Sequence, residues 1–300
     1  MDFVTLNEVG PRDGLQNDSA SVSPVARAEL IKRLVAAGLP AVEVASFVSP
    51  RAVPKMAGAD QVLAALDLAS ADFSVLIPNR KGYDLARRAG ARSVAVVLSA
   101  TDTMNIKNIN MDLATARGVC EEIVRQAQLD GVAGRAYVSV AAGCPYEGDV
   151  PVARIVELAQ CMFAAGATEV IVADTIGAAN PAQVKTLFGA LTREFGTERL
   201  CAHFHDTRAL ALANAWQALE CGIRKFDTSI GGLGGCPFAP GAAGNLATED
   251  LVSLLAQTGF ETGIDMQALL GVVAYARELV GHDLGGRSLA WLETSGGAVA

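Results

Sequence analysis

Two of the three histidines in the chain, His203 and His205, are spaced so that they could bind one metal ion. They stand two residues apart in a short apolar run, residues 200–205, that has the pattern of a β-strand. Alternate residues of a strand point to the same side of the sheet. Two imidazoles on one side, beside carboxylates, are a common metal-ligand arrangement. A pair of core histidines held by hydrogen bonds is the alternative interpretation.

Asp13 could supply a third ligand. It follows the first predicted strand, residues 3–9, and in a closed barrel this loop lies against the last strand. A helix cap or an ion pair with Arg12 is the other interpretation. Asp206 follows His205 directly, and we expect it to cap a helix that begins at Thr207. Two histidines and one carboxylate leave positions open for substrate oxygens and suit Zn, Fe, Mn or Mg.

Three more charged residues belong to the same predicted region. Arg12 could stabilise an oxyanion such as an enolate. Glu43 lies inside the apolar run AVEVASF, and Asp174 ends another apolar run. Either carboxylate could orient a water molecule, a ligand or Arg12. A surface salt bridge for Arg12, and structural networks for the two acids, are the alternatives.

Cys236 lies in the glycine-rich stretch 227–250, which reads DTSIGGLGGCPFAPGAAGNLATED. Its glycines and prolines exclude a regular helix or strand at the centre. A glycine-hinged loop with a single thiol, placed after a strand, is typical of an active-site lid. The thiol could supply a proton or act as a nucleophile. A long surface connection is the alternative.

Eight β-like runs alternate with helical patterns along the chain, which predicts a (β/α)₈ TIM barrel. We expect one catalytic domain over residues 1–300, with a C-terminal helical extension at about 264–285 and a flexible tail. An open doubly wound sheet is the alternative, but no G-x-G-x-x-G motif follows the first strand. The predicted strands are 3–9, 41–47, 73–77, 93–98, 135–141, 169–173, 200–205 and 225–230. The main predicted helices are 24–37, 58–69, 80–89, 112–129, 151–165, 181–195, 207–221 and 264–280.

The overall composition narrows the class of protein. Hydrophobic residues make up 51% of the chain and charged residues 19%, as in a globular protein. A net charge of −8 argues against a nucleic-acid partner. The sequence has no long uncharged apolar run and no leader pattern, so we expect a cytoplasmic protein without a membrane partner. The cysteines form no C-x-x-C pair and are expected to be reduced.

Seven motifs stand in order along the chain: EVGPRDGLQN (8–17), SFVSPRAVPKM (46–56), KNIN (107–110), GCPYEG (143–148), DTIG (174–177), HFHDT (203–207) and GLGGCPFAPGAAGNLATEDL (232–251). Together they resemble one known family, the 3-hydroxy-3-methylglutaryl-CoA (HMG-CoA) lyases, and the resemblance runs from residue 4 to about residue 280. It implies a metal-dependent barrel that cleaves HMG-CoA to acetyl-CoA and acetoacetate. A lyase for a related substrate, such as citramalyl-CoA or a longer 3-substituted glutaryl-CoA, is the alternative, and a non-catalytic acyl-CoA or metal-binding barrel is a third.

The resemblance also implies roles for individual residues. A divalent cation, Mg²⁺ or Mn²⁺, would be held by Asp13, His203, His205 and Asn245. The base would be His203 or a water molecule near Asp174 and Glu43. Arg12 would hold the enolate and Cys236 would deliver a proton. The residues implied near the substrate or its CoA arm are Arg12, Gln16, Asn108 and Tyr137. A homodimer is also implied.

The chain departs from the family pattern at three places. Arg208 and Ala209 stand where the family usually has Tyr-Gly, and Ala173 stands where it usually has Gly. The segment before KNIN also differs. These changes fall at predicted strand ends around the pocket, and they therefore bear on which acyl group is accepted.

Overall fold

The computed structural model describes residues 2–235 and 244–294, which contain a closed barrel of eight parallel strands. The strands follow one another around the barrel in chain order, and β1 pairs with β8 to close it. The predicted (β/α)₈ barrel is therefore confirmed, with strand ends within two residues of those expected. The strands are β1 (Thr5–Glu8), β2 (Ala41–Ser46), β3 (Asp72–Leu76), β4 (Ser93–Ser99), β5 (Ala133–Ser139), β6 (Glu169–Asp174), β7 (Leu200–Phe204) and β8 (Lys225–Thr228).

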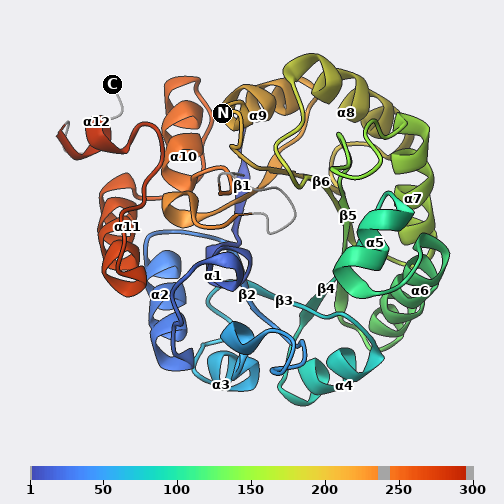
Figure 1. Cartoon of the computed structure of the whole chain (residues 1–300). Helices are drawn as coiled ribbons and strands as arrows, with labels where there is room; N and C mark the ends of the chain where they lie inside the picture. Colours follow the sequence, from blue (N-terminus) through green and yellow to red (C-terminus); the bar gives the residue numbers. More distant parts are fainter. Residues whose placement is uncertain (1, 236–243, 295–300) are drawn as a thin grey trace.

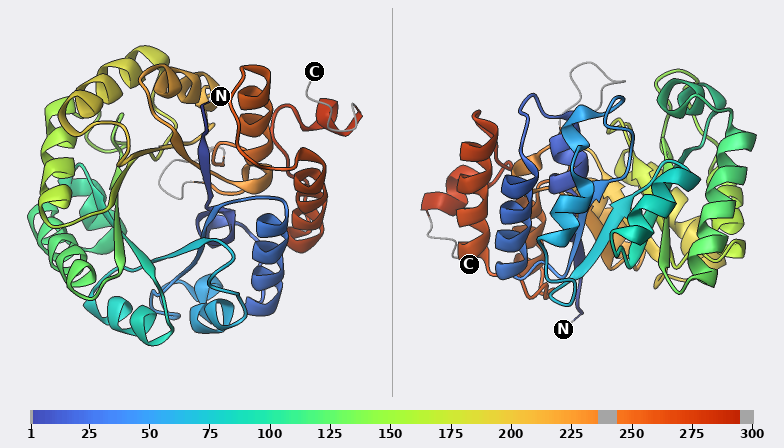
Figure 2. Two further views of the ribbon diagram at one scale, coloured as in Figure 1. Left: turned by 180° about the vertical axis from the view of Figure 1, so that it is seen from behind. Right: turned by 90° about the horizontal axis from the view of Figure 1, so that it is seen from below.

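Helices form a ring around the strands, as Figures 1 and 2 show. Their apolar faces pack against the outward side chains of the strands in one large buried cluster. The helices between the strands are α1 (Leu15–Asn17), α2 (Pro24–Ala36), α3 (Ala59–Ala64), α4 (Arg80–Arg88), α5 (Asp102–Ile109), α6 (Leu113–Leu129), α7 (Val152–Ala164), α8 (Pro181–Phe195) and α9 (Ala211–Glu220), with a short 3-10 turn η2 (Pro54–Met56).

The inside of the barrel has a different chemistry from the outside. A small apolar cluster at mid-height fills part of the lumen, and charged or polar side chains occupy the layers on both sides of it. Barrels are usually filled by layers of branched aliphatic side chains. The polar layers of this lumen depart from that pattern. The apolar cluster consists of Leu76, Ala95, Tyr137, Ile171, Ala173 and Cys201, with Val97 packed against it.

The helix that was predicted to begin at Thr207 begins at Ala211, so that boundary was wrong. Ala209 has a φ of 57°, in the left-handed region that a helix excludes. Arg208 donates hydrogen bonds to the carbonyls of Gly177 and Ala178 in the loop after β6. Asp206 nevertheless accepts a hydrogen bond from the N–H of Ala211 at 3.1 Å, so it still serves the start of α9.

The chain continues beyond β8 into η3 (Ile230–Gly232), α10 (Thr248–Gln257), α11 (Met266–Val280) and α12 (Leu289–Thr294). The extension packs α11 against α2 outside the barrel (Figure 1). Two carboxylates in the first turn of α10 fasten this extension to the end of the barrel. Glu249 accepts hydrogen bonds from the N–H groups of Gly231 and Gly286, and Asp250 accepts from those of Arg287 and Ser288. Among the described helices, none is long and apolar enough to cross a membrane.

Glu8, at the end of β1, joins three parts of the chain. Its carboxylate accepts hydrogen bonds from the N–H groups of Gly10 and Ile230 at 2.8 Å and from the Thr248 hydroxyl at 2.6 Å. Glu8 is completely buried, and the loss of hydration raises its pKa to about 7 in spite of these donors.

This pKa predicts that the metal-free protein loses stability as the pH rises from about 4.5 to 7. In that window the folded state keeps the Glu8 proton and the unfolded chain has released it, so a rising pH favours unfolding. The contribution of Glu8 is roughly 3 kcal/mol. Glu249, whose pKa is also raised to about 7 by burial, adds a similar amount.

Glu8→Gln keeps the shape of the side chain and removes its titration. Urea unfolding at several pH values, with a chelator present, is expected to show a smaller loss of stability with rising pH than in the parent protein. An unchanged slope would show that Glu8 is ionised in the folded state across this range.

Candidate active site

The strand register brings His203, Asp227 and Asn7 into one row across three neighbouring strands. His203 on β7 is the partner of Asp227 on β8, and Asp227 is the partner of Asn7 on β1. Because alternate residues of a strand point inward, all three side chains meet inside the barrel. His205 follows on the same side, above His203. The predicted pairing of the two histidines on one face is therefore found, with ring centroids 5.2 Å apart.

Asp13 reaches the histidines from a tight π-turn, η1 (Gly10–Gly14), that follows β1. The carbonyl of Val9 accepts hydrogen bonds from the N–H groups of Arg12, Asp13 and Gly14, which curl the chain over the end of the barrel. A side chain at Gly14 would meet the Cβ atom of Leu233 at 2.8 Å. Glycine at this position lets the turn lie directly against the segment after β8.

Asp13, His203 and His205 form a cluster that can hold a metal ion, with one ligand atom from each lying within 4.8 Å of the others. Asn245 lies beside them. Its Nδ2 atom donates to Asp13 Oδ2 at 2.9 Å, while its buried Oδ1 atom has no hydrogen-bond partner within residues 2–235 and 244–294. A buried amide oxygen without a partner is costly unless a ligand binds it. One carboxylate, two imidazoles and one amide oxygen therefore fit a divalent cation.

Arg12 is fixed by two carboxylates at the edge of this cluster. Its Nη1 atom donates to Asp13 Oδ1 at 2.7 Å, and its Nε atom binds Glu43 Oε1. Burial works against the charge of Arg12, but Glu43 and Asp13 outweigh it, and the pKa of Arg12 is raised. Burial likewise opposes the charge of Asp13, yet Arg12 and the histidines hold its pKa below the usual value. Both groups therefore remain charged at neutral pH.

Asp227 has a central place that the sequence analysis did not assign to it. Its Oδ2 atom accepts from His203 Nδ1 at 3.0 Å and lies 2.8 Å from the Tyr137 hydroxyl, and its Oδ1 atom accepts from Asn7 at 2.7 Å. Since a carboxylate can only accept here, Nδ1 of His203 carries the hydrogen and Nε2 is left for the pocket.

Neighbouring groups shift the pKa values of Asp227, His203 and Tyr137. Burial favours the neutral form of Asp227, but His203 and Arg135 overcome it and lower its pKa to about 2. Burial would also lower the pKa of His203, yet Asp227 raises it. Burial, followed by the charges of Asp227 and Glu43, raises the pKa of Tyr137 far above its usual value. Tyr137 is therefore a neutral hydroxyl between two carboxylates, since it also lies 3.1 Å from Glu43 Oε2.

Asp174 ends β6, as predicted, but its carboxylate is turned into its own loop. Its two oxygens accept hydrogen bonds from the N–H groups of Ala178 and Ala179 at 2.7 and 3.0 Å. Burial raises the pKa of Asp174, and the two N–H groups oppose that rise. The side chain shapes the loop after β6 behind the pocket.

A pocket of about 410 Å³ opens over the cluster at the carboxyl ends of the strands. Arg12, Asp13, His203 and His205 line it, and so do the predicted substrate residues Gln16, Asn108 and Tyr137. Glu43 lies completely buried beneath Arg12. The remaining wall is mostly apolar and includes Val48, Val53, Leu76, Pro78, Val97, Met104, Ile109 and Met111.

The two ends of the glycine-rich loop meet at Asn245. Asn245 Nδ2 donates to the Leu233 carbonyl at 3.0 Å, and a side chain at Gly234 would meet this same nitrogen at 2.6 Å. Gly234 has a φ of 130°, which side chains rarely adopt. Cys236 lies outside the described residues, but it is bonded to Gly235, which lines the 410 Å³ pocket.

Two places at which the chain departs from the family pattern line this pocket: Ala173, and Met104 in the segment before KNIN. Arg208 is directed instead to the loop after β6, where its Nε atom donates to the Gly177 carbonyl at 2.9 Å. The pocket wall therefore has a methyl group at Ala173 where the family pattern has Gly, and it includes one residue of the altered segment.

Comparison with known proteins places this barrel beside a group of lyases. The family model described as HMGL-like matches residues 4–275. A hydroxymethylglutaryl-CoA lyase of Bacillus subtilis is 40% identical over 97% of this chain and 98% of its own. An (R)-citramalyl-CoA lyase of Chloroflexus aurantiacus is 41% identical over 95% of this chain and 93% of its own.

Solved structures agree with the sequence comparison. The crystal structure of the Bacillus subtilis HMG-CoA lyase superposes with a TM-score of 0.94, covering 98% of this chain and 99% of that one. An HMG-CoA lyase of Acinetobacter baumannii, in complex with coenzyme A and 3-methylmalate, gives a TM-score of 0.92 at 38% identity, covering 96% of this chain and 95% of that one.

The partnerless oxygen of Asn245 predicts that Asn245→Ala weakens metal binding. Titration of chelator-stripped protein with Mn²⁺ is expected to give an affinity lower by about tenfold or more. Asn214→Ala is the matched control, because Asn214 on α9 also has a buried partnerless Oδ1 but binds Ala179 away from the cluster. Equal Mn²⁺ affinities in the parent protein and in Asn245→Ala would remove Asn245 from the ligand set.

Proposed function

The chain belongs to the HMGL-like family of carbon–carbon lyases, and from this premise we propose that it cleaves 3-hydroxy-3-methylglutaryl-CoA to acetyl-CoA and acetoacetate. One observation carries the proposal. The metal-binding cluster, Arg12 and the residues expected near an acyl-CoA all line the same 410 Å³ pocket. An apolar cavity with a few convergent polar groups is the usual form of a small-molecule site.

The proposed cofactor is a divalent cation, Mg²⁺ or Mn²⁺, held by Asp13, His203, His205 and Asn245. The carboxylate and amide oxygens favour these ions over softer metals. Such a cation would supply Lewis-acid polarisation of the C3 hydroxyl and the distal carboxylate of the substrate. The chain itself fixes the ligands: Asp227 sets the tautomer of His203, Arg12 holds Asp13, and the Leu233 carbonyl holds Asn245.

Arg12 is proposed to bind the thioester oxygen as the C2–C3 bond breaks. Its Nε and Nη1 atoms bind Glu43 and Asp13, so its Nη2 atom can donate to the developing enolate. The two carboxylates hold the guanidinium in place before the substrate arrives. A preorganised donor of this kind stabilises an oxyanion transition state by roughly 3 kcal/mol.

The proton of the C3 hydroxyl is proposed to leave through a water molecule in the pocket and from there to solvent. Glu43 uses one oxygen for Arg12 and the other for Tyr137, and Asp174 uses both oxygens for backbone N–H groups. These two acids are therefore proposed to position Arg12 and the loop after β6. His203 donates its Nδ1 hydrogen to Asp227 and has Nε2 among the proposed metal ligands, so it is proposed to orient that water molecule and not to accept the proton itself.

Cys236 is proposed to give a proton to the carbanion carbon and so complete acetyl-CoA. What supports this role is that its neighbour in the chain, Gly235, lines the pocket. Positioned proton transfer of this kind typically accelerates a reaction by about 10²–10⁴. Gln16 and Asn108 are proposed to contact the substrate or its CoA arm from the pocket wall. A homodimer stays a prediction.

A second candidate substrate is citramalyl-CoA, whose acid arm is shorter by one carbon. The observation that favours it is Ala173, because its methyl group enters the pocket where the family pattern has Gly. The citramalyl-CoA lyase among the relatives is as similar to this chain as the HMG-CoA lyases are.

Acetyl-CoA release from a small panel of thioesters tests the function. HMG-CoA, citramalyl-CoA and a longer 3-substituted glutaryl-CoA would each be supplied with Mg²⁺, with Mn²⁺ and with a chelator. We expect the highest kcat/KM on HMG-CoA and no turnover with the chelator. Preference for citramalyl-CoA would favour the second candidate, and no cleavage of any thioester would refute both.

Cys236→Ser is expected to lower kcat by about 10²-fold or more, because serine is a much weaker acid than the thiol. Mn²⁺ affinity should not change, since Cys236 is not in the proposed ligand set. Cys221→Ser is the matched control, as Cys221 lies at the end of α9 outside the pocket. A Cys236→Ser protein with the parent kcat would assign the proton to another group.

A further inference from the structure

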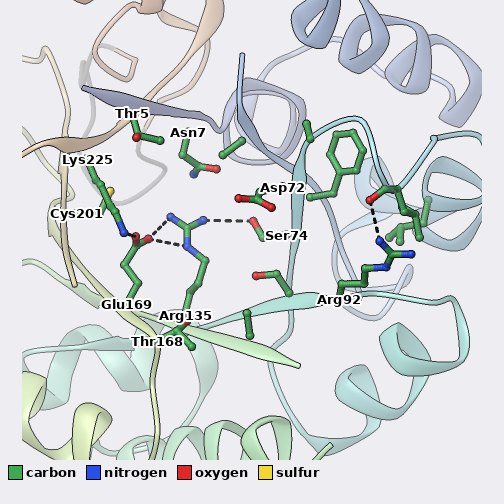
Figure 3. Close-up of a pocket in the computed structure, with 17 residues that line it drawn as sticks. Thr5, Asn7, Asp72, Ser74, Arg92, Arg135, Thr168, Glu169, Cys201 and Lys225 are labelled. Carbon is green, nitrogen blue, oxygen red and sulfur yellow. Dashed lines mark hydrogen bonds and ion pairs between the residues drawn. The ribbon is translucent and has the colours of Figure 1, made fainter. Parts of the chain in front are cut away.

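The opposite mouth of the barrel contains a second pocket, of about 470 Å³, that no part of the proposed chemistry uses. It is lined by the first residues of most strands, among them Thr5, Ala41 and Lys225. Figure 3 shows Arg135 at its centre, with its guanidinium directed to Glu169 on one side and to Ser74 on the other. Small side chains such as Ser93 and Ala133 leave the space open.

Arg135 enters the lumen because it stands two residues before Tyr137 on β5, on the same side of the strand. Its register partner on β6 is Glu169, and their side chains form a partly buried ion pair at 2.6 Å. Glu169 also binds Lys225 at 3.1 Å. Two cations thus share a single carboxylate at this mouth, and the charge of Arg135 is only partly balanced there.

The guanidinium of Arg135 also extends toward the active site. Its Nη2 atom lies 3.7 Å from Asp227 Oδ1, the oxygen that is turned away from His203. The Asn7 amide donates to this same oxygen at 2.7 Å, and the Cys201 thiol donates to it at 3.6 Å. The two carboxylate oxygens of Asp227 therefore have separate partners. Oδ1 lies near Arg135, Asn7 and Cys201, and Oδ2 contacts His203 and Tyr137.

We propose that Arg135 is a positioning residue for the metal site, which it supports from the far mouth of the barrel by holding Asp227 against His203. The orientation of the Asp227 carboxylate decides which ring nitrogen of His203 carries hydrogen and how Nε2 faces Asp13 and His205. Arg135 attracts Oδ1 and leaves Oδ2 for His203. This inference rests on the proposed metal site, and it adds a residue that touches neither metal nor substrate.

A double-mutant cycle tests whether Arg135 acts through Asp227. Arg135→Met is expected to weaken Mn²⁺ binding about tenfold, and Asp227→Asn at least as much, in line with other residues that orient metal ligands. In the Asp227→Asn background, Arg135→Met should cause no further loss. Independent, multiplying effects in the double variant would overturn the proposal, and so would parent affinity in Arg135→Met.

Nitrogen NMR of histidine-labelled, metal-free protein gives a second reading that a general structural defect would not produce. The chain has only three histidines, so the His203 ring can be assigned by substitution. The parent protein should carry hydrogen on Nδ1 of His203, and Arg135→Met should give a mixture of the two tautomers while His282 stays unchanged. An unaltered His203 signal would contradict the proposal.

Two further variants test whether the loss of a positive charge in the pocket, or a folding defect, explains the effect of Arg135→Met. Arg92→Met is the matched control, because Arg92 lines the same pocket but binds the Leu68 carbonyl and should leave Mn²⁺ affinity unchanged. If Arg92→Met weakens the metal as much as Arg135→Met, the proposal fails. Arg135→Met combined with Glu169→Gln removes both members of the partly buried pair, so that neither is left without its partner. It should show the same metal defect.

These measurements need no turnover. If the parent protein binds Mn²⁺ but cleaves no thioester, the proposed function fails and the cycle still decides the role of Arg135. If turnover is found but Arg135→Met and Asp227→Asn weaken Mn²⁺ binding independently, only the positioning role is wrong. With metal at saturation, Arg135→Met should recover most of kcat, and Arg135→Lys should bind Mn²⁺ more tightly than Arg135→Met.

Discussion

The structure depends on the pairing of buried charge inside the barrel, with Asp227 at its centre. An ionised carboxylate without hydration is very costly unless its oxygens are satisfied by donors and opposite charges. Here β1, β5 and β7 each direct a side chain to this one residue on β8: Asn7, Tyr137 and His203, with Arg135 close by. The outer face of the strands is apolar and secures the fold, so the lumen is free to serve the chemistry. The cost of burying a single charge is thereby distributed over four strands.

The same pairing of buried charges orients the side chains of the site before any ligand binds. Arg12 lies between Asp13 and Glu43, Glu43 also contacts Tyr137, and Tyr137 returns to Asp227. Each of these side chains limits the orientations that its neighbour can take. The positions of the proposed metal ligands and of the proposed oxyanion donor are therefore set together. A network of this kind stabilises a structure only when every member is satisfied. Asn245 beside this network has a buried Oδ1 atom with no hydrogen-bond partner among the described residues, and it lies where a metal ligand is proposed.

Much of this arrangement could be predicted from the sequence, and the remainder has a physical reason for having been missed. The spacing of His203 and His205 was informative because a strand repeats every two residues. The order of the strands likewise placed Asp13 near them. Asp227 and Arg135 carry the same kind of signal, an ionised residue at an inward position of an apolar strand, but their importance depends on contacts across the lumen between strands distant in sequence. Asn245 came only from the family resemblance, since a loop amide has no periodicity. The start of α9 was misplaced because the left-handed backbone of Ala209 leaves no trace in hydropathy.

The pairing of β1 with β8 decides when, during synthesis of the chain, the proposed site can form. Asn7 and Asp227 are 220 residues apart, and Asp13 is 232 residues from Asn245. A chain emerging from the ribosome therefore exposes Asp13 long before His203, His205 and Asn245 have been made. The proposed metal site comes into existence only when the last strand joins the first. Metal loading would thus be a late event, and a prematurely ended chain lacking β8 would have no complete site to load.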